Sequence, residues 1–111
     1  METAHHIADT LDLPVNIEHG ACEWLNPEWF SEPPRYLPPD EMRRRFPRID
    51  EQYESMVSPS LPESREDLNA RCRETAHCLV RDYSSTILII GHAASAIALT
   101  QGLVEPYSDG E

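Results

Sequence analysis

The sequence predicts an α/β fold of three layers, in which helices flank a mostly parallel sheet that is truncated at both ends. The first observation is the apolar run 86–90, whose lack of alternation is typical of a strand buried on both faces. The second is the alanine-rich stretch 93–103 directly after it, which predicts a helix ending near Gly102. The third is a helical pattern over 64–82, just before the strand. Helices on either side of a buried strand are typical of a parallel sheet.

The corner between the predicted strand and the last helix holds Gly91 and His92. In open α/β sheets, ligands bind beyond the carboxyl ends of the strands, where a following helix presents its free N–H groups. The local sequence leaves two interpretations of His92. It is either a polar loop residue or a group that binds an anion such as a phosphoryl group.

The chain opens with helical spacing of apolar residues over 2–11, and Leu13-Pro14 ends that pattern. No loop precedes this helix beyond Met1, so we expect the chain to start inside a domain whose earlier strands are absent. The alternation in 15–18 predicts a short strand near a sheet edge, followed by a turn at His19-Gly20.

Residues 21–31 read as a loop in which Glu23 stands between Cys22 and Trp24. Burial beside aromatic side chains raises the pKa of a carboxyl group and suits it to donate a proton near neutral pH. The other interpretation is that Glu23 is one of thirteen glutamates in the chain and is solvated like most of them. These residues alone do not decide between the two.

Prolines stiffen the segment 33–39, which we expect to lie over the core as a long loop; a proline-rich ligand for another protein is the alternative. A short helix follows from Pro39 or Asp40 up to Pro47. Its three arginines, 43–45, form either a charged exposed turn or a phosphate-binding cluster. The next stretch, 49–61, has no lasting periodicity and predicts a surface loop.

Ser64 and Asp67 form a capping box, which predicts a helix that ends near Asp82 or Tyr83. The residues expected on its inner face are Leu68, Cys72, Thr75, Ala76, Leu79 and Val80. Those expected on its outer face are Arg65, Glu66, Arg71, Arg73 and Glu74. A zinc site from Cys72, His77 and Cys78 lacks the usual ligand spacing, so the two cysteines are interpreted as small core residues.

Composition limits the partners. The 111 residues include twenty acidic residues, nine arginines and no lysine. The resulting net charge of −11 repels a nucleic-acid backbone. The apolar runs are too short for a membrane span, and the first residues lack the pattern of a secretory signal. Three cysteines without paired spacing fit a reducing compartment. We therefore expect a cytoplasmic protein that binds neither nucleic acid nor membrane.

The motifs, taken in order, resemble the histidine phosphatase superfamily, which has the phosphoglycerate-mutase-like fold. The loop pair Glu23-Trp24 and the proline-rich segment are most similar to the phosphatase domain of the Sts-type proteins, the suppressors of T-cell receptor signalling. The resemblance covers a partial domain, residues 1–104, and leaves 105–111 as a polar C-terminal tail. The segments that carry it are 2–7, Glu23-Trp24, 36–41, 46–50 with Tyr53, the helix with Arg71, and 89–95.

The resemblance implies roles for two residues. His92 corresponds to the family's second histidine, which helps to hold the transferring phosphoryl group, and Glu23 corresponds to the acid that protonates the leaving oxygen. The implied substrates are phosphotyrosine proteins or small phosphate esters, and no metal or other cofactor is needed. Such chemistry requires a hydrogen-bonding cradle for the equatorial oxygens and an acid on the leaving-group side.

The family's nucleophile belongs to an Arg-His-Gly motif on the first strand, and this sequence contains no such motif. The nearest histidines, His5 and His6, lie within a predicted helix whose pattern is structural. The resemblance therefore implies a fragment or short isoform without turnover of its own. The alternatives are a non-catalytic acidic protein-interaction module and a sugar-phosphate mutase of the same fold. Absence of a central strand also exposes sheet edges, which predicts a tendency to form homo-oligomers.

Overall fold

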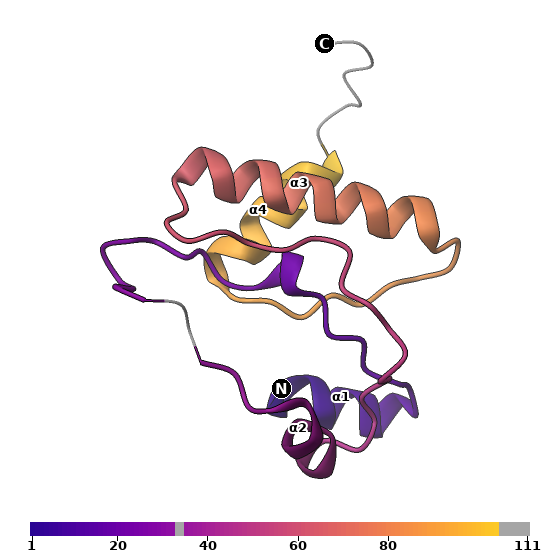
Figure 1. Ribbon diagram of the computed structural model, residues 1–111. Coiled ribbons are helices and arrows are strands. Elements are labelled where there is room, and N and C mark those ends of the chain that lie inside the picture. The colour runs from indigo at the N-terminus through magenta and orange to yellow at the C-terminus, as the bar shows by residue number, and fades with distance from the viewer. Residues whose placement is uncertain (33–34, 105–111) are drawn as a thin grey trace.

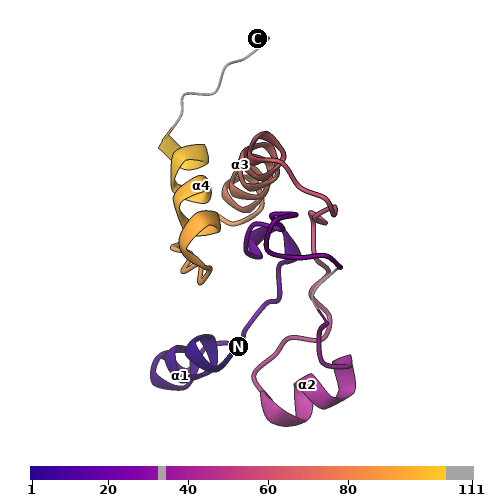
Figure 2. The same cartoon turned by 90° about the vertical axis from the view of Figure 1, so that its left-hand side faces the viewer.

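The computed structural model describes residues 1–32 and 35–104, and its helices fall into two groups (Figures 1 and 2). Helices α3 and α4 and the short 3-10 turn η1 pack together in one group, whereas α1 and α2 lie away from them. No helix in the described part of the chain is long and apolar enough to cross a membrane. The elements are α1 (Glu2–Leu11), η1 (His19–Ala21), α2 (Pro39–Arg45), α3 (Arg65–Asp82) and α4 (Ala93–Val104).

Helix α3 is the longest of these elements, and the structure confirms its predicted bounds. The Ser64 Oγ accepts the Asp67 N–H at 3.1 Å, and the Asp67 Oδ2 accepts the Ser64 N–H at 3.0 Å, which completes the capping box. Five of the predicted inner residues are buried, but Val80 is 54% exposed, so its placement on the inner face was wrong. The five that are buried are Leu68, Cys72, Thr75, Ala76 and Leu79.

The core lies where α3, α4 and η1 meet, and its residues are mostly small. Gly102 was predicted to end α4, but the helix continues to Val104 and Gly102 packs against α3 instead. A Cβ added at Gly102 would lie 2.9 Å from the Arg73 Cα, so only glycine allows the two helices to approach this closely. Gly20 of η1 likewise lies against the Thr75 side chain. The core cluster consists of Ala21, Leu68, Cys72, Ala76, Ala98 and Leu99.

Residues 86–90 connect α3 to α4 without regular secondary structure, and no backbone of the described residues pairs with them. Ile89 packs on the core, whereas Leu88 is 60% exposed, so burial on both faces, as the sequence predicts, is not found here. Elsewhere, Val15 and Ile49 form one parallel bridge in place of the predicted edge strand. The three-layer α/β sheet truncated at both ends therefore stays a prediction, and the predicted tail 105–111 lies outside the described residues.

Helices α1 and α2 form where the sequence predicts them. Helix α1 ends at Asp12 in the left-handed conformation, which aspartate tolerates better than most residues. Arg48 holds that end, because its guanidinium donates to Asp9 at 2.6 Å and to Asp12 at 3.1 Å. In α2, Arg43 pairs with Asp40 and Arg45 pairs with Glu41. These pairs favour the charged exposed turn over a phosphate-binding cluster.

The carboxylate of Glu18 fastens the segment before α3 to η1. It accepts hydrogen bonds from the N–H groups of Met56 and Gly20 at 2.7 and 2.8 Å, and from the hydroxyls of Tyr53 and Ser55 at 2.8 Å each. Burial alone raises the pKa of Glu18, but these hydrogen bonds outweigh it and hold the pKa below its ordinary value of 4.5.

Glu18→Gln is expected to lower the free energy of unfolding at pH 7 by about 1–3 kcal/mol, because several donors lose a charged acceptor. Since the folded-state pKa of Glu18 is depressed, its stabilisation is present above the unfolded-state pKa and is lost as the pH falls through the folded-state pKa. Urea unfolding between pH 3 and 7 should therefore show a shallower acid decline for Glu18→Gln than for the wild type. Glu28→Gln, at an exposed position, serves as the control; equal acid slopes for the wild type and Glu18→Gln would contradict this role.

Candidate functional site

The N-terminus of α4 is a tight corner that starts directly after His92. The Ser95 side chain folds back over this turn, and its Oγ accepts the His92 N–H at 3.1 Å. The Ala96 N–H donates to the His92 carbonyl at 2.7 Å, which closes the first helical turn. The N–H groups of Ala93 and Ala94 have no acceptor within the described ranges. The imidazole of His92 is exposed beside them, so the corner can meet an anion from solvent.

Glu23 reaches this corner from a loop 72 residues earlier in the chain. Its Oε1 accepts the Ser95 N–H at 3.0 Å and the N–H of its own neighbour Trp24 at 2.9 Å. The carboxylate is half-buried and lies within one helical turn of His92. The structure therefore brings the two predicted site residues to the same helix end, with one acidic and one imidazole side chain.

Trp24 follows Glu23 in the chain, and its ring is fixed in place. Its indole Nε1–H donates to the Glu63 carbonyl at 2.8 Å. The Trp29 ring meets it edge to face at 5.5 Å, and the Arg65 guanidinium lies 5.5 Å from its ring centroid. The loop that carries Glu23 is thus held by ring contacts as well as by hydrogen bonds.

Neither Cys22 nor the two histidines of α1 supply a replacement nucleophile at the corner. Burial raises the pKa of the Cys22 thiol, which keeps it protonated and poorly nucleophilic near neutral pH. His5 lies on α1, where its Nε2 is 3.2 Å from Asp9 and its ring packs on Phe46. His6 is exposed on the same helix, and α1 makes no contact with α3 or α4. In the described parts of the chain, no three metal-ligating side chains are close enough to hold an ion.

The sequence analysis missed the ion pair behind the corner, between Glu63 and Arg71. Arg71 was predicted to lie on the outer face of α3, but it is 6% exposed and Glu63 is 1% exposed. The signal that could have shown this is spacing, because Arg71 lies three residues after Leu68 and four before Thr75, on the apolar face. A charged residue on that face requires a buried partner.

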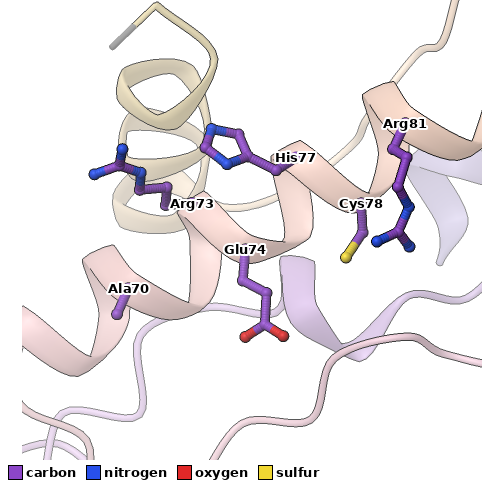
Figure 3. A pocket seen from close by; sticks show the side chains of 6 residues that line it. All are labelled: Ala70, Arg73, Glu74, His77, Cys78 and Arg81. Carbon is purple, nitrogen blue, oxygen red and sulfur yellow. The ribbon is translucent and has the colours of Figure 1, made fainter. Parts of the chain in front are cut away.

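A hollow of about 660 Å³ lies elsewhere, on one face of α3 (Figure 3). Neither Glu23 nor His92 lines it. Its wall comes from a single helix, and the His77 imidazole is held by the Gly102 carbonyl at 3.1 Å. Its lining residues are Ala70, Arg73, Glu74, His77, Cys78 and Arg81. We therefore place the candidate site at the α4 corner and not in this hollow.

The chain belongs to the histidine phosphatase superfamily (branch 1), which it matches over residues 1–108. It is also similar to the transcription factor tau 55 kDa subunit of Saccharomyces cerevisiae (strain ATCC 204508 / S288c), with 28% identity over 112 aligned residues. That alignment covers 94% of this chain and 26% of the yeast protein, so the chain spans about a quarter of this relative's length.

Proposed function

We propose that this chain is the acid-bearing part of a phosphatase that acts on phosphotyrosine proteins or small phosphate esters, with His92 and Glu23 as its site residues. The observation that supports this most is the 3.0 Å hydrogen bond from the Ser95 N–H to the Glu23 carboxylate, one turn from His92. The proposal includes the three-layer α/β sheet and the kinship with the Sts-type phosphatase domain. It also includes a cytoplasmic location, as the cysteine usage suggests.

The two residues would act from different sides of the bound phosphoryl group. The His92 imidazole and the N–H groups of Ala93 and Ala94 can donate to its equatorial oxygens. Glu23 lies beside them and would give its proton to the leaving oxygen. The Ser95 N–H holds Glu23 in this place, and no metal is required for either role.

The nucleophile is the part that these 111 residues do not supply, because they hold no Arg-His-Gly motif. His5 and His6 do not reach the corner, and the Cys22 thiol is protonated. We therefore expect the chain alone, as a fragment or short isoform, to bind phosphate esters without turning them over. Turnover requires a histidine nucleophile from additional sequence.

His92→Ala is expected to weaken binding of inorganic phosphate about tenfold or more, because one charged hydrogen bond, about 1.5–3 kcal/mol, is lost. The measurement is calorimetric titration of the full 111-residue chain with phosphate at low ionic strength. His6→Ala, which removes an exposed histidine on α1, is the matched control and should bind like the wild type. Unchanged phosphate affinity in His92→Ala would rule out the proposed site.

A non-catalytic interaction module is the second candidate function, and exposed apolar side chains favour it. Trp29 is 61% exposed, Tyr36 57% and Leu88 60%. Large exposed apolar groups are typical of protein interfaces, including those between copies of one chain. The yeast relative is named as a subunit of a transcription factor, which fits a role in an assembly. In this case Trp29→Ala should weaken capture of a protein partner, whereas His92→Ala should leave it unchanged.

A further inference from the structure

The Glu63–Arg71 ion pair is almost completely removed from solvent. The Arg71 Nε donates to the Glu63 Oε2 at 2.8 Å and the Nη2 donates to the Oε1 at 2.8 Å, which makes the pair bidentate. Their side chains are 5% and 1% exposed. Buried ion pairs are weak devices for stability, because desolvation of the charges offsets their attraction. Two apolar side chains could fill the same space, so stability alone does not explain why a buried ion pair occupies it.

The remaining hydrogen bonds of this pair go to the backbone of the loop that carries Glu23. Arg71 donates to the carbonyls of Gly20 at 2.8 Å, Cys22 at 3.0 Å and Glu23 at 3.4 Å. The Glu63 Oε1 accepts the Leu25 N–H at 3.1 Å. The Glu63 backbone also donates to the Leu25 carbonyl and accepts the Trp24 indole N–H. The pair is therefore hydrogen-bonded to the backbone on both sides of Glu23.

These hydrogen bonds restrict the position of the Glu23 side chain. A guanidinium offers its N–H donors in a rigid fork, so bonds to Glu63 and to three carbonyls set the loop's position and orientation together. The Glu23 carboxylate then meets the Ser95 N–H at 3.0 Å, at the end of a different helix. A shift of the loop by about 1 Å would break that contact.

We propose that Arg71 and Glu63 are positioning residues for Glu23, which hold its carboxylate against the N-terminus of α4. The reason for holding Glu23 in place rests on the proposed function, because a proton donor must lie at a fixed position beside the phosphoryl group. The positioning of Glu23 by Arg71 and Glu63 does not itself require phosphate. The positioning role and the proposed function can therefore be refuted separately.

The test follows the Ser95 amide proton by NMR as the pH is varied, with no phosphate present. Because the Ser95 N–H donates to the Glu23 carboxylate, a change in the charge of that carboxylate is expected to move the Ser95 signal in one step of chemical shift. Glu23→Gln identifies the step that belongs to Glu23, because that variant removes it.

Arg71→Lys keeps a positive charge opposite Glu63, but one ammonium cannot reach Glu63 and three carbonyls together. The expected result is loss of the Glu23-dependent step in the Ser95 signal, although Glu23 is still present. Arg48→Lys is the matched control, since Arg48 binds Asp9 and Asp12 far from the corner, and it should keep the full step. A full step in Arg71→Lys would overturn the proposal.

Glu63→Asp keeps the test decisive if Arg71→Lys does not fold. This variant keeps the charge and shortens the side chain by one methylene, which pulls the carboxylate away from the Leu25 N–H and the guanidinium. A diminished Ser95 step supports the positioning role, and an unchanged step overturns it. A wild type that binds no phosphate but shows the Glu23-dependent Ser95 step refutes the proposed function and leaves the positioning role standing.

Discussion

Glu63→Ala is expected to lower the free energy of unfolding by about 3–5 kcal/mol, which is a large part of the stability of a small domain. The substitution leaves the Arg71 guanidinium buried without its carboxylate and the Leu25 N–H without its acceptor. An unpaired buried charge costs far more than the intact pair contributes. Urea unfolding followed by tryptophan fluorescence measures the change, because Trp24 contacts the Glu63 carbonyl.

Two further variants test whether the loss of stability in Glu63→Ala comes from the unpaired charge of Arg71. Glu66→Ala removes an exposed glutamate from the first turn of α3, and its effect should stay within about 0.5 kcal/mol. The double substitution Glu63→Leu with Arg71→Met removes both charges and should be more stable than Glu63→Ala. If Glu63→Ala costs no more than Glu66→Ala, the buried ion pair does not exist in solution.

Hydrolysis of p-nitrophenyl phosphate is the second result with a large expected effect. The 111-residue chain should show no turnover, because it lacks the Arg-His-Gly motif. A version extended at its N-terminus by a strand with that motif should hydrolyse the ester, since the nucleophile then joins His92 and Glu23. Equal rates for the two proteins would contradict the account of the nucleophile.

The extended protein also separates the roles of the two site residues. Glu23→Gln should lower kcat by about 10²–10⁴-fold, the usual contribution of a general acid. The loss of kcat should be smaller for p-nitrophenyl phosphate, whose leaving group departs readily without a proton, than for phenyl phosphate, whose leaving group needs one. Glu28→Gln, five residues along the loop and exposed, should keep the full rate.

The helices could be predicted from the sequence because their signals are local. The capping box of Ser64 and Asp67 marks the start of α3, and Pro39 marks the start of α2. Gly102 shows the limit of such signals, since a glycine near a helix end usually stops it. Here its small size serves the contact with Arg73 in α3, which no local pattern reveals.

Burial of the segment 86–90 could not be decided locally either, because it depends on partner strands that the segment itself does not encode. Its apolar residues predict a covered strand, yet in the structure Leu88 is 60% exposed. The corner posed the same difficulty. Glu23 and His92 are far apart in sequence, and the family resemblance, not residue spacing, linked them before the structure brought them together.

The buried pair behind the corner was missed for a related reason. A glutamate before a helix and an arginine within it look like solvated surface residues, and only the fold shows that both are enclosed. Arg71 stands on the apolar face of α3, but its partner Glu63 precedes the helix, outside the i to i+4 range where charge pairs are normally sought.

The idea on which the functional proposal depends is that His92 and the first turn of α4 form one phosphate-binding corner with Glu23. The most direct measurement is an NMR titration of the wild-type chain with inorganic phosphate, which follows the His92 imidazole and the Ser95 amide in the same samples. Both signals should shift with the same dissociation constant, and in His92→Ala the Ser95 shift should require about tenfold more phosphate or above. If the Ser95 amide does not respond while the imidazole shifts, or if neither responds, the corner is not a single phosphate site.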